Sequence, residues 1–466
     1  MPDLHVVIMA AGKGTRMKSA RPKVLHNVAG KPMITRVLTS AQSLSPRTTT
    51  IVVGHMKELL RHGLDGYPDL AYVTQEPQLG TGHALLQTAA LLERKTGIVL
   101  LLSGDVPLLK SHTLAGLVQK HVESKVAATV LTALVDQPYG YGRIARLKGR
   151  ITRIVEERDA SPAQRKIREI NSGVYAFSIG PLFESLRGLA TGNAQGEYYL
   201  TDLVSTYRRR RLGVETVVVD DPNEIRGINS RSELAEASRI VRQKKNEELM
   251  AAGVTVEDPA TTYVDDDVVV GADTVLHPGV HLEGKTQIGQ ACEIHSGVRI
   301  INSTLGDRVT VQNHCVINSG RLATGVTIGP FAHVRPDTEL GESVHIGNFV
   351  ELKKAVLGKG TKAGHLAYIG DAVVGENVNI GAGTITCNYD GKHKHLTTIE
   401  DGVFVGTDSQ LVAPVTIRKG AYIGSGTTIR ENVPAGALAV SAGKQRNIEG
   451  WVDKKKAESK KVESKK

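Results

Sequence analysis

The C-terminal half of this chain repeats an aliphatic residue at every sixth position, and this repeat restricts the possible folds more than any other feature. Its registers differ by single-residue slips, and its members are Val264, Val270, Leu276, Leu282, Ile288, Ile294 and Ile300; Leu305, Val311 and Ile317; Leu322, Ile328, Val334, Leu340, Ile346 and Leu352; and Val405, Leu411, Ile417, Ile423 and Ile429. A period of six fits neither an α-helix nor a plainly alternating strand. It predicts a left-handed parallel β-helix of hexapeptide repeats, in which a following glycine, as in Ile288-Gly289, helps the backbone turn a corner.

Two stretches of this half fit the six-residue period poorly. Residues 386–400 interrupt it, and we expect them to form a loop that leaves the solenoid, where function is often found. Residues 362–368 contain His365, the one histidine of the sixteen that we select as a catalytic candidate. Stacked coils would bring these stretches close to Arg335, Lys353 and Lys354.

The N-terminal half alternates apolar runs with helical patterns. We expect strands at 4–9, 50–53, 98–102, 127–134 and 214–219, and helices at 31–40, 83–92 and 113–121. This alternation predicts an α/β domain with a Rossmann-like, mostly parallel sheet and helices on both faces. Ligands of such domains bind at the carboxyl ends of the strands.

The patterns divide the chain into four segments: an α/β domain at 1–228, a linker helix at 229–252, a β-helix at 253–437 and a tail at 438–466. The tail is basic, with seven lysines among its last sixteen residues, and we expect its end to be disordered and solvated. Nucleic-acid binding is the alternative use of such a tail. It is not expected here, because no aromatic residues are interleaved with the lysines to stack on bases.

The composition favours a cytoplasmic protein that handles small phosphorylated molecules. The formal net charge is +10, and phosphorylated substrates explain the basic excess outside the tail. The three cysteines, Cys292, Cys315 and Cys387, form no CxxC pair, so a reducing compartment is expected rather than a disulfide framework. No apolar stretch approaches the length of about 18 residues that a membrane span requires.

A glycine-rich turn follows the first predicted strand. The sequence MAAGKGTRM covers residues 9–17, and Gly12 and Gly14 would let backbone N–H groups approach a phosphate. Taken alone, such a turn is a weak signal, since it matches neither GxGxxG nor a Walker A motif. Further blocks follow in order: PKVL at 22–25, QLGTGHA at 78–84, GDVP at 104–107, YGRI at 141–144, IVE at 154–156, EINSG at 169–173 and GIN at 227–229.

This series of blocks resembles the sugar-nucleotide pyrophosphorylases. Together with the hexapeptide half, nearly the whole chain is similar to the family of bacterial bifunctional N-acetylglucosamine-1-phosphate uridylyltransferases/glucosamine-1-phosphate N-acetyltransferases. The resemblance implies a uridylyltransferase in 1–228 and an N-acetyltransferase in 253–437. It also implies a homotrimer whose acetyl sites are shared between subunits.

For the uridylyltransferase, the resemblance implies a site for UTP and UDP-N-acetylglucosamine. Its expected residues are Met9, Ala10, Ala11, Gly12, Lys23, Gln75, Gly80, Thr81, Ser103, Gly104, Asp105, Gly142, Glu156, Asn171 and Asn229. Asp105 and Asn229 would bind Mg²⁺, and Arg16 and Lys23 would supply positive charge where oxyanions crowd during phosphoryl transfer. Structural alternatives stay open: Asp105 as a turn cap, Glu156 as a surface acid and Asn229 as a helix cap.

For the acetyltransferase, the resemblance implies that His365 accepts the proton of the sugar amine, which suits an imidazole near neutral pH. Glu351 would orient or polarise it. Arg335, Lys353, Tyr368 and Asn379 would bind glucosamine-1-phosphate, and Ala382, Asn388, Tyr389, Thr407 and Ser425 would lie along the acetyl-CoA path. The family usually has an arginine where this chain has Ala442, with Lys444 and Arg446 as candidates to replace it.

The sequence thus predicts acetyl transfer from acetyl-CoA to glucosamine-1-phosphate, followed by uridylyl transfer from UTP with release of pyrophosphate. The product would feed peptidoglycan and, in a Gram-negative cell, lipopolysaccharide. One alternative keeps only the uridylyltransferase and makes the β-helix a trimerisation or regulatory scaffold. Another is a nucleotide-sugar enzyme for a different sugar, such as glucose.

Overall fold

The computed structural model describes residues 2–12, 14–441, 443, 445 and 447–463, and the chain divides into two compact units, Met1–Lys244 and Lys245–Lys466. The division falls inside helix α9 (Arg231–Ala251), which occupies the segment predicted to be a linker helix. Among the described residues, no helix is both long enough and apolar enough to cross a membrane.

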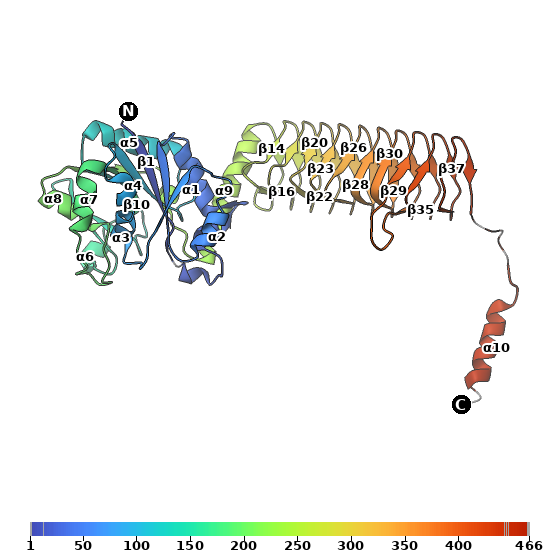
Figure 1. Ribbon diagram of the computed structural model, residues 1–466, viewed down its shortest axis with the longest axis horizontal. Helices are drawn as coiled ribbons and strands as arrows, with labels where there is room; N and C mark the ends of the chain where they lie inside the picture. The colour runs from blue at the N-terminus through green and yellow to red at the C-terminus, as the bar shows by residue number, and fades with distance from the viewer. Residues whose placement is uncertain (1, 13, 442, 444, 446, 464–466) are drawn as a thin grey trace. The chain divides into compact units, whose positions relative to one another are not determined.

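The first unit is built on a sheet of nine strands (Figure 1). Seven of them follow the order β11-β7-β10-β6-β1-β4-β5, and the other two form the hairpin β8–β9, which pairs with β10. The strands are β1 (Leu4–Met9), β4 (Thr48–Val53), β5 (Leu70–Thr74), β6 (Ile98–Ser103), β7 (Ala128–Leu134), β8 (Arg143–Leu147), β9 (Arg150–Val155), β10 (Glu169–Ser178) and β11 (Val214–Val218). β1 pairs in parallel with β4 and β6, whereas β10 runs antiparallel to β6 and β7. The Rossmann-like, mostly parallel sheet is therefore confirmed.

Helices cover both faces of this sheet, because its central strands are apolar on both sides. Val6 and Ile8 pack into one hydrophobic cluster, whereas Val7 packs into the other. The helices are α1 (Met33–Gln42), α2 (Lys57–His62), α3 (Thr81–Leu86), α4 (Ala89–Leu92), α5 (Ser111–Ser124), α6 (Pro162–Arg165), α7 (Ile179–Arg187) and α8 (Asp202–Arg209). The single helix expected at 83–92 is two helices. Between them the Thr88 hydroxyl donates to the Leu85 carbonyl at 2.7 Å, a local bond that competes with the helical ladder.

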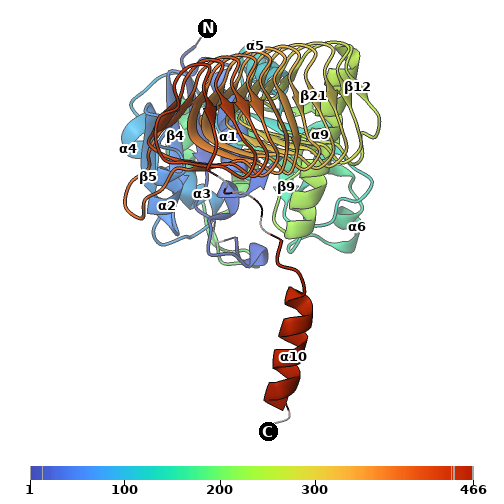
Figure 2. The ribbon, with the colours of Figure 1, turned by 90° about the vertical axis from the view of Figure 1, so that its right-hand side faces the viewer.

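The second unit is a left-handed β-helix that runs from β12 (Thr255–Val256) to β39 (Leu438–Ala439), with its coils lying one behind another (Figure 2). Val264 pairs with Leu282, eighteen residues on, and Ile300 pairs with Ile317, seventeen residues on. Each slip of the sequence repeat is thus one shorter coil. The repeat residues form the core; Leu282 and Ile317, for example, are fully buried.

One coil is longer than the others. Ala372 in β30 (Tyr368–Val374) pairs with Thr397 in β33 (Thr397–Ile399), twenty-five residues later. The excess forms the loop 388–396, which leaves the solenoid (Figure 1). It is shorter than the expected 386–400, because β32 (Ile385–Cys387) and β33 stay in the sheet. Residues 362–365, in contrast, stay in register as β29 (Lys362–His365), with Ala363 buried where the repeat has larger residues.

The tail contains helix α10 (Trp451–Glu463), where the sequence predicts disorder. Lysine, glutamate and alanine are good helix formers. In addition, the Lys455 ammonium lies 5.0 Å from the centre of the Trp451 ring, one helical turn away. Helix propensity and this local contact account for the difference.

Candidate active sites

A cavity of about 930 Å³ lies at the carboxyl ends of β1, β4 and β6 in the first unit. It opens where the parallel strands end, as the fold class predicts. Ten of the predicted nucleotide-site residues line it: Met9, Ala10, Ala11, Gly12, Lys23, Gln75, Gly80, Thr81, Ser103 and Asp105. The structure thus gathers five separate sequence blocks around one cavity.

Two glycines of this cavity matter for the path of its backbone. No heavy atom lies within 4 Å of a Cβ built on Gly12, so the loop after β1 leaves its backbone free for a ligand. Gly80 has φ +106°, and a Cβ there would meet the Tyr198 carbonyl oxygen at 2.8 Å. The buried Gln75 amide fixes this turn by donating to the Gly80 carbonyl at 2.9 Å.

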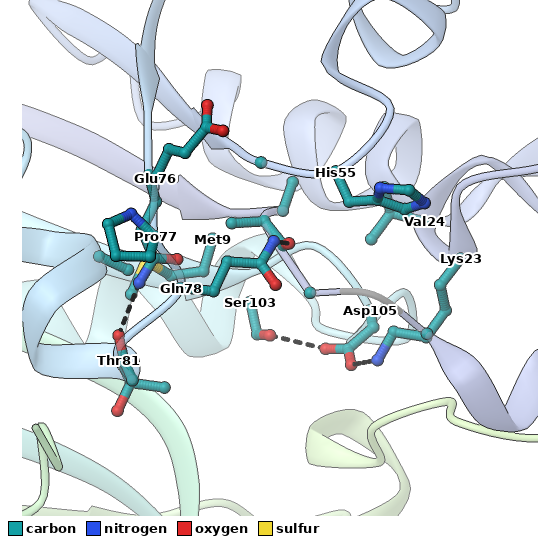
Figure 3. Close-up of a pocket in the computed structure, with 18 of the residues that line it drawn as sticks. Met9, Lys23, Val24, His55, Glu76, Pro77, Gln78, Thr81, Ser103 and Asp105 are labelled. Carbon is teal, nitrogen blue, oxygen red and sulfur yellow. Dashed lines mark hydrogen bonds and ion pairs between the residues drawn. The ribbon is translucent and has the colours of Figure 1, made fainter. Parts of the chain in front are cut away.

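Lys23, Asp105 and Asn229 form one cluster in the first unit, although they are far apart in the sequence. The Lys23 ammonium donates to the Asp105 carboxylate and to the Asn229 side-chain oxygen, the latter at 2.9 Å. Ser103 donates to the other Asp105 oxygen at 2.6 Å, and Figure 3 shows the carboxylate between the two donors. The oxygens predicted to hold Mg²⁺ therefore converge on a point where a cationic group fits.

A smaller cavity of about 200 Å³ shares Met9, Thr81, Ser103 and Asp105 with the larger one. Glu156 and Asn171, both predicted to hold the sugar, line it. The Glu156 carboxylate accepts from the Thr201 hydroxyl at 3.0 Å, and burial raises the pKa of this glutamate. Gly142 lies behind the two, since a Cβ there would come within 3.6 Å of the Glu156 carboxylate. Glu156 is therefore a half-buried acid of the cavity wall, which disfavours the surface-acid alternative.

Four predicted residues of the first unit line neither cavity: Gly142 and Asn229, whose contacts are given above, and Arg16 and Gly104. Arg16 is exposed and lines neither cavity. Gly104 supports the strand end, because its N–H donates to the Met9 carbonyl at 2.9 Å. Conversely, His55 and Gln78 line the larger cavity without having been selected from the sequence. His55 follows β4, so its place after a parallel strand was the available signal.

Three of the five predicted acetyl-CoA residues fall on one corner of the β-helix, and the other two, Asn388 and Tyr389, lie on the loop. Ala363 pairs with Ile380, Ile380 with Val405 and Val405 with Ile423. Two positions further along each coil, this register stacks His365, Ala382, Thr407 and Ser425. A single line along the solenoid thus leads from the predicted proton acceptor to the predicted coenzyme residues.

His365 has a polar partner that the sequence did not reveal. Its Nδ1 lies 2.6 Å from the side-chain oxygen of Asn348, and the two residues are paired between β27 (His345–Asn348) and β29. Because the amide oxygen can only accept, this contact favours the tautomer of the neutral imidazole that has its N–H at Nδ1 and its lone pair at Nε2. Glu351, expected to orient His365, accepts instead from Arg335 at 2.8 Å.

A group of cations lies near the end of the loop and on a neighbouring strand. The adjacent Lys394 side chain holds the pKa of Lys353 below its usual value, with Arg335 contributing charge. The contact with Lys353 and the charge of Asp371 raise the pKa of Lys394. The sequence analysis missed Lys394. Adjacent like charges of this kind favour the binding of an anion.

The remaining predicted residues of the second unit lie on the loop, on strand β30 beside it, and on another sheet of the solenoid. Asn388 is buried and donates to the Asp371 carboxylate and, at 3.4 Å, to the Tyr368 hydroxyl. Asn379 lies in β31 (Asn379–Ile380), paired with Lys362. Tyr389 is 60% exposed at the loop. Ala442, Lys444 and Arg446 lie outside the described residues.

Comparisons with known proteins match both units. The family model of the MobA-like NTP transferase domain matches residues 6–170, and that of the GMPPB C-terminal domain matches residues 264–344. Relatives named bifunctional protein GlmU include those of Pelobacter propionicus, 48% identical over 97% of this chain and 98% of the relative, and Trichlorobacter lovleyi, 49% identical over the same shares. A third, from Heliobacterium modesticaldum, is 48% identical over 96% of this chain and 98% of the relative.

Among solved structures, a putative glucose-1-phosphate thymidylyltransferase from Bacillus anthracis aligns with a TM-score of 0.42 and 20% identity, covering 51% of this chain and 95% of that one.

Proposed function

Because this chain belongs to the family of bifunctional GlmU proteins, we propose that one polypeptide carries out two consecutive transfers. The second unit acetylates glucosamine-1-phosphate with acetyl-CoA, and the first joins the product to the uridylyl group of UTP. The observation that carries this is a match of 48–49% identity that spans both halves. It favours two activities over a lone uridylyltransferase with an inert scaffold, and the product serves cell-wall synthesis.

A coupled assay tests this function. Purified protein is supplied with glucosamine-1-phosphate, acetyl-CoA, UTP and Mg²⁺, and pyrophosphate release is measured. Omitting acetyl-CoA should stop the reaction, and supplying N-acetylglucosamine-1-phosphate should restore it. A preference for glucose-1-phosphate over the N-acetylated sugar would instead favour the different-sugar alternative.

In the uridylyl transfer, the sugar phosphate attacks the α-phosphorus of UTP and pyrophosphate leaves. The open backbone at Gly12 approaches the phosphates, and the smaller cavity holds the sugar against Glu156 and Asn171. Asp105 and Asn229 would hold Mg²⁺, because the Lys23 ammonium already contacts one side-chain oxygen of each residue and a cation therefore fits there. When bound, the ion neutralises phosphate charge. Lys23, which donates to both Asp105 and Asn229, would supply a second positive charge to the phosphate oxygens.

In the acetyl transfer, His365 takes the proton of the sugar amine through Nε2, because Asn348 occupies Nδ1. The amine attacks the thioester carbonyl, and the thiol of CoA leaves. Arg335, Lys353 and Lys394 hold the phosphate of glucosamine-1-phosphate. Acetyl-CoA lies along the corner formed by Ala382, Thr407 and Ser425.

Replacing Lys394 by Ala should raise the KM for glucosamine-1-phosphate about tenfold, because one charge-assisted bond to the phosphate is lost. The pH dependence should also move. In the unaltered protein, kcat/KM falls as pH rises through the lowered pKa of Lys353, since the neutral amine no longer attracts phosphate. Without Lys394 that fall should begin at a higher pH. Lys392→Ala, an exposed lysine of the same loop, is the matched control. An identical alkaline limb in both variants would contradict the phosphate role.

We also infer that the protein is a homotrimer with shared acetyl sites. The support is an exposed ladder of apolar residues beside Asn348 and His365: Phe331, Phe349 and Leu366 are 49%, 55% and 61% exposed. The Phe331 and Phe349 rings stack with centroids 5.5 Å apart. Such a contiguous apolar strip is typical of a surface that another chain covers. The three free cysteines and the UTP and acetyl-CoA substrates support a cytoplasmic location.

Phe331→Asp should dissociate the trimer and abolish most acetyl transfer while leaving uridylyl transfer intact. The substitution suits the backbone, because Phe331 has φ +56° and aspartate tolerates this left-handed conformation. Sedimentation velocity gives the assembly state, and Val269→Asp, at a 59% exposed position of the same solenoid, is the control. A monomer that acetylates at the full rate would rule out the shared site.

A further inference from the structure

Four polar side chains converge on one face at the start of the β-helix, and none of them belongs to the sites described above. Pairing of Val256 with Leu276 and of Leu276 with Ile294 places Glu257, His277 and His295 in one column across three successive coils. The two imidazole rings stack with centroids 4.6 Å apart and planes 6° from parallel. Glu293 lies beside them, so that four ligand-type side chains share one patch.

His277 has a carboxylate oxygen near each of its two ring nitrogens. Its Nδ1 lies 3.0 Å from Glu257 Oε2, while its Nε2 lies 3.4 Å from Glu293 Oε1. In metal sites, a ligating histidine commonly binds the ion through one ring nitrogen and directs the other toward a carboxylate. His277 therefore lies in surroundings that suit a metal-bound imidazole.

The spacing of three of these atoms suits a tetrahedral metal ion. Zn²⁺ binds imidazole nitrogen and carboxylate oxygen at about 2.0–2.2 Å, which sets neighbouring ligand atoms about 3.3–3.5 Å apart. Glu293 Oε1 lies 3.4 Å from His277 Nε2 and 3.5 Å from His295 Nε2. Ligand atoms of the three residues all lie within 4.8 Å of one another. Two of the three distances therefore already match a tetrahedral site, and the two stacked rings would have to tilt toward each other to complete it.

We propose that His277, His295 and Glu293 form a binding site for a divalent transition metal ion, with Zn²⁺ as the best fit to two imidazoles and a carboxylate. Glu257 Oε2 lies 3.0 Å from His277 Nδ1, where it would accept the N–H of a histidine that binds the metal through Nε2, as carboxylates commonly do behind a metal-bound histidine. The His277 and His295 side chains are 22% and 26% exposed, which leaves an open side for entry and for a water ligand.

The site would fasten the first coils of the solenoid to one another. Each coil of a repeat fold is stabilised mainly by its neighbours, and terminal coils have a neighbour on one side only. The metal joins the coils of His277 and His295 directly and the coil of Glu257 through its 3.0 Å contact with His277. Because the ligands come together only in the folded state, metal binding should stabilise the folded protein.

Zn²⁺ itself is the probe, added to the full chain after treatment with a chelator. We expect the unaltered protein to bind one more equivalent of Zn²⁺ per chain than the double variant His277→Ala/His295→Ala in competition with a chromophoric chelator. Saturating Zn²⁺ should also raise the melting temperature by about 2–4 °C or more, and this rise should be absent from the double variant. Glu293→Gln should weaken Zn²⁺ binding while keeping both histidines.

The matched control is His281→Ala/His314→Ala, which removes two histidines of the same solenoid that also stack on aromatic rings. It should bind Zn²⁺ as the unaltered protein does. The Asp105 site is present in every variant, so the difference of one equivalent reports this cluster alone. Equal Zn²⁺ binding by the unaltered protein and the His277/His295 variant, or an equal loss in the control, would overturn the proposal.

Discussion

Replacing His365 by Ala should lower the rate of acetyl transfer by about 10²–10⁴-fold, because no other group would take the proton from the attacking amine. Uridylyl transfer from UTP to supplied N-acetylglucosamine-1-phosphate should keep its rate. Thiol release from acetyl-CoA measures the first reaction and pyrophosphate release the second. His281→Ala, a histidine of the same solenoid that stacks on Tyr263, should leave both rates unchanged.

Asn348 should act on the same reaction through His365. Asn348→Ala removes the acceptor at 2.6 Å that holds the ring and its tautomer, so kcat should fall about 10–10²-fold. The KM values for both substrates should change little, because the side chain contacts His365 rather than a substrate. Asn348→Asp restores an acceptor and should recover part of the rate.

If His365→Ala acetylates at the rate of the unaltered protein, the β-helix is a scaffold and the second activity lies elsewhere.

Replacing Asp105 by Asn should lower uridylyl transfer by about 10²–10³-fold and leave acetyl transfer unchanged. The substitution keeps the shape of the side chain but removes the charge that Lys23 contacts and that the proposed Mg²⁺ requires. The Mg²⁺ concentration needed for half-maximal pyrophosphate release should rise with it. Both readings come from one titration of Mg²⁺ at saturating UTP.

The control for Asp105 is Asp136→Asn, an 86% exposed aspartate of the same unit that pairs with Arg168 on the surface. Surface pairs of this kind contribute little, so the control should keep its rate and its Mg²⁺ response. An unchanged Mg²⁺ titration in Asp105→Asn would support the turn-capping role instead. Asn229→Ala removes the second oxygen near Lys23. It should also raise the Mg²⁺ concentration needed for half-maximal pyrophosphate release.

The fold of the second unit was predictable because the six-residue repeat that specifies it can be recognised in short segments of the sequence. An aliphatic residue every six positions places one side chain per face in the core, and the pairing of Val264 with Leu282 follows directly. The parallel core of the first unit was predictable from apolar runs such as 98–102. The antiparallel strand β10 was not, because strand direction depends on the chain's route between elements and not on the composition of the strand.

The grouping of residues around the larger cavity was largely predictable, since most of them lie in short blocks, several of which follow a parallel strand. The second candidate site was less predictable. Asn348 and Lys394 carry no motif of their own, and they matter only through contacts with His365 and Lys353. Glu351 was given the role of partner to His365, and the structure pairs it with Arg335. These contacts cross between coils, where sequence separation says little about distance.

The sequence by itself determined the β-helix, the α/β sheet and the identity of the residues most suited to the two transfers. Periodicity and residue chemistry are properties of short segments, so both can be recognised without knowledge of the rest of the chain. Only the tertiary structure decided which side chains meet, because coils of seventeen, eighteen and twenty-five residues set the register at each corner. That register places Asn348 against His365 and stacks His277 on His295.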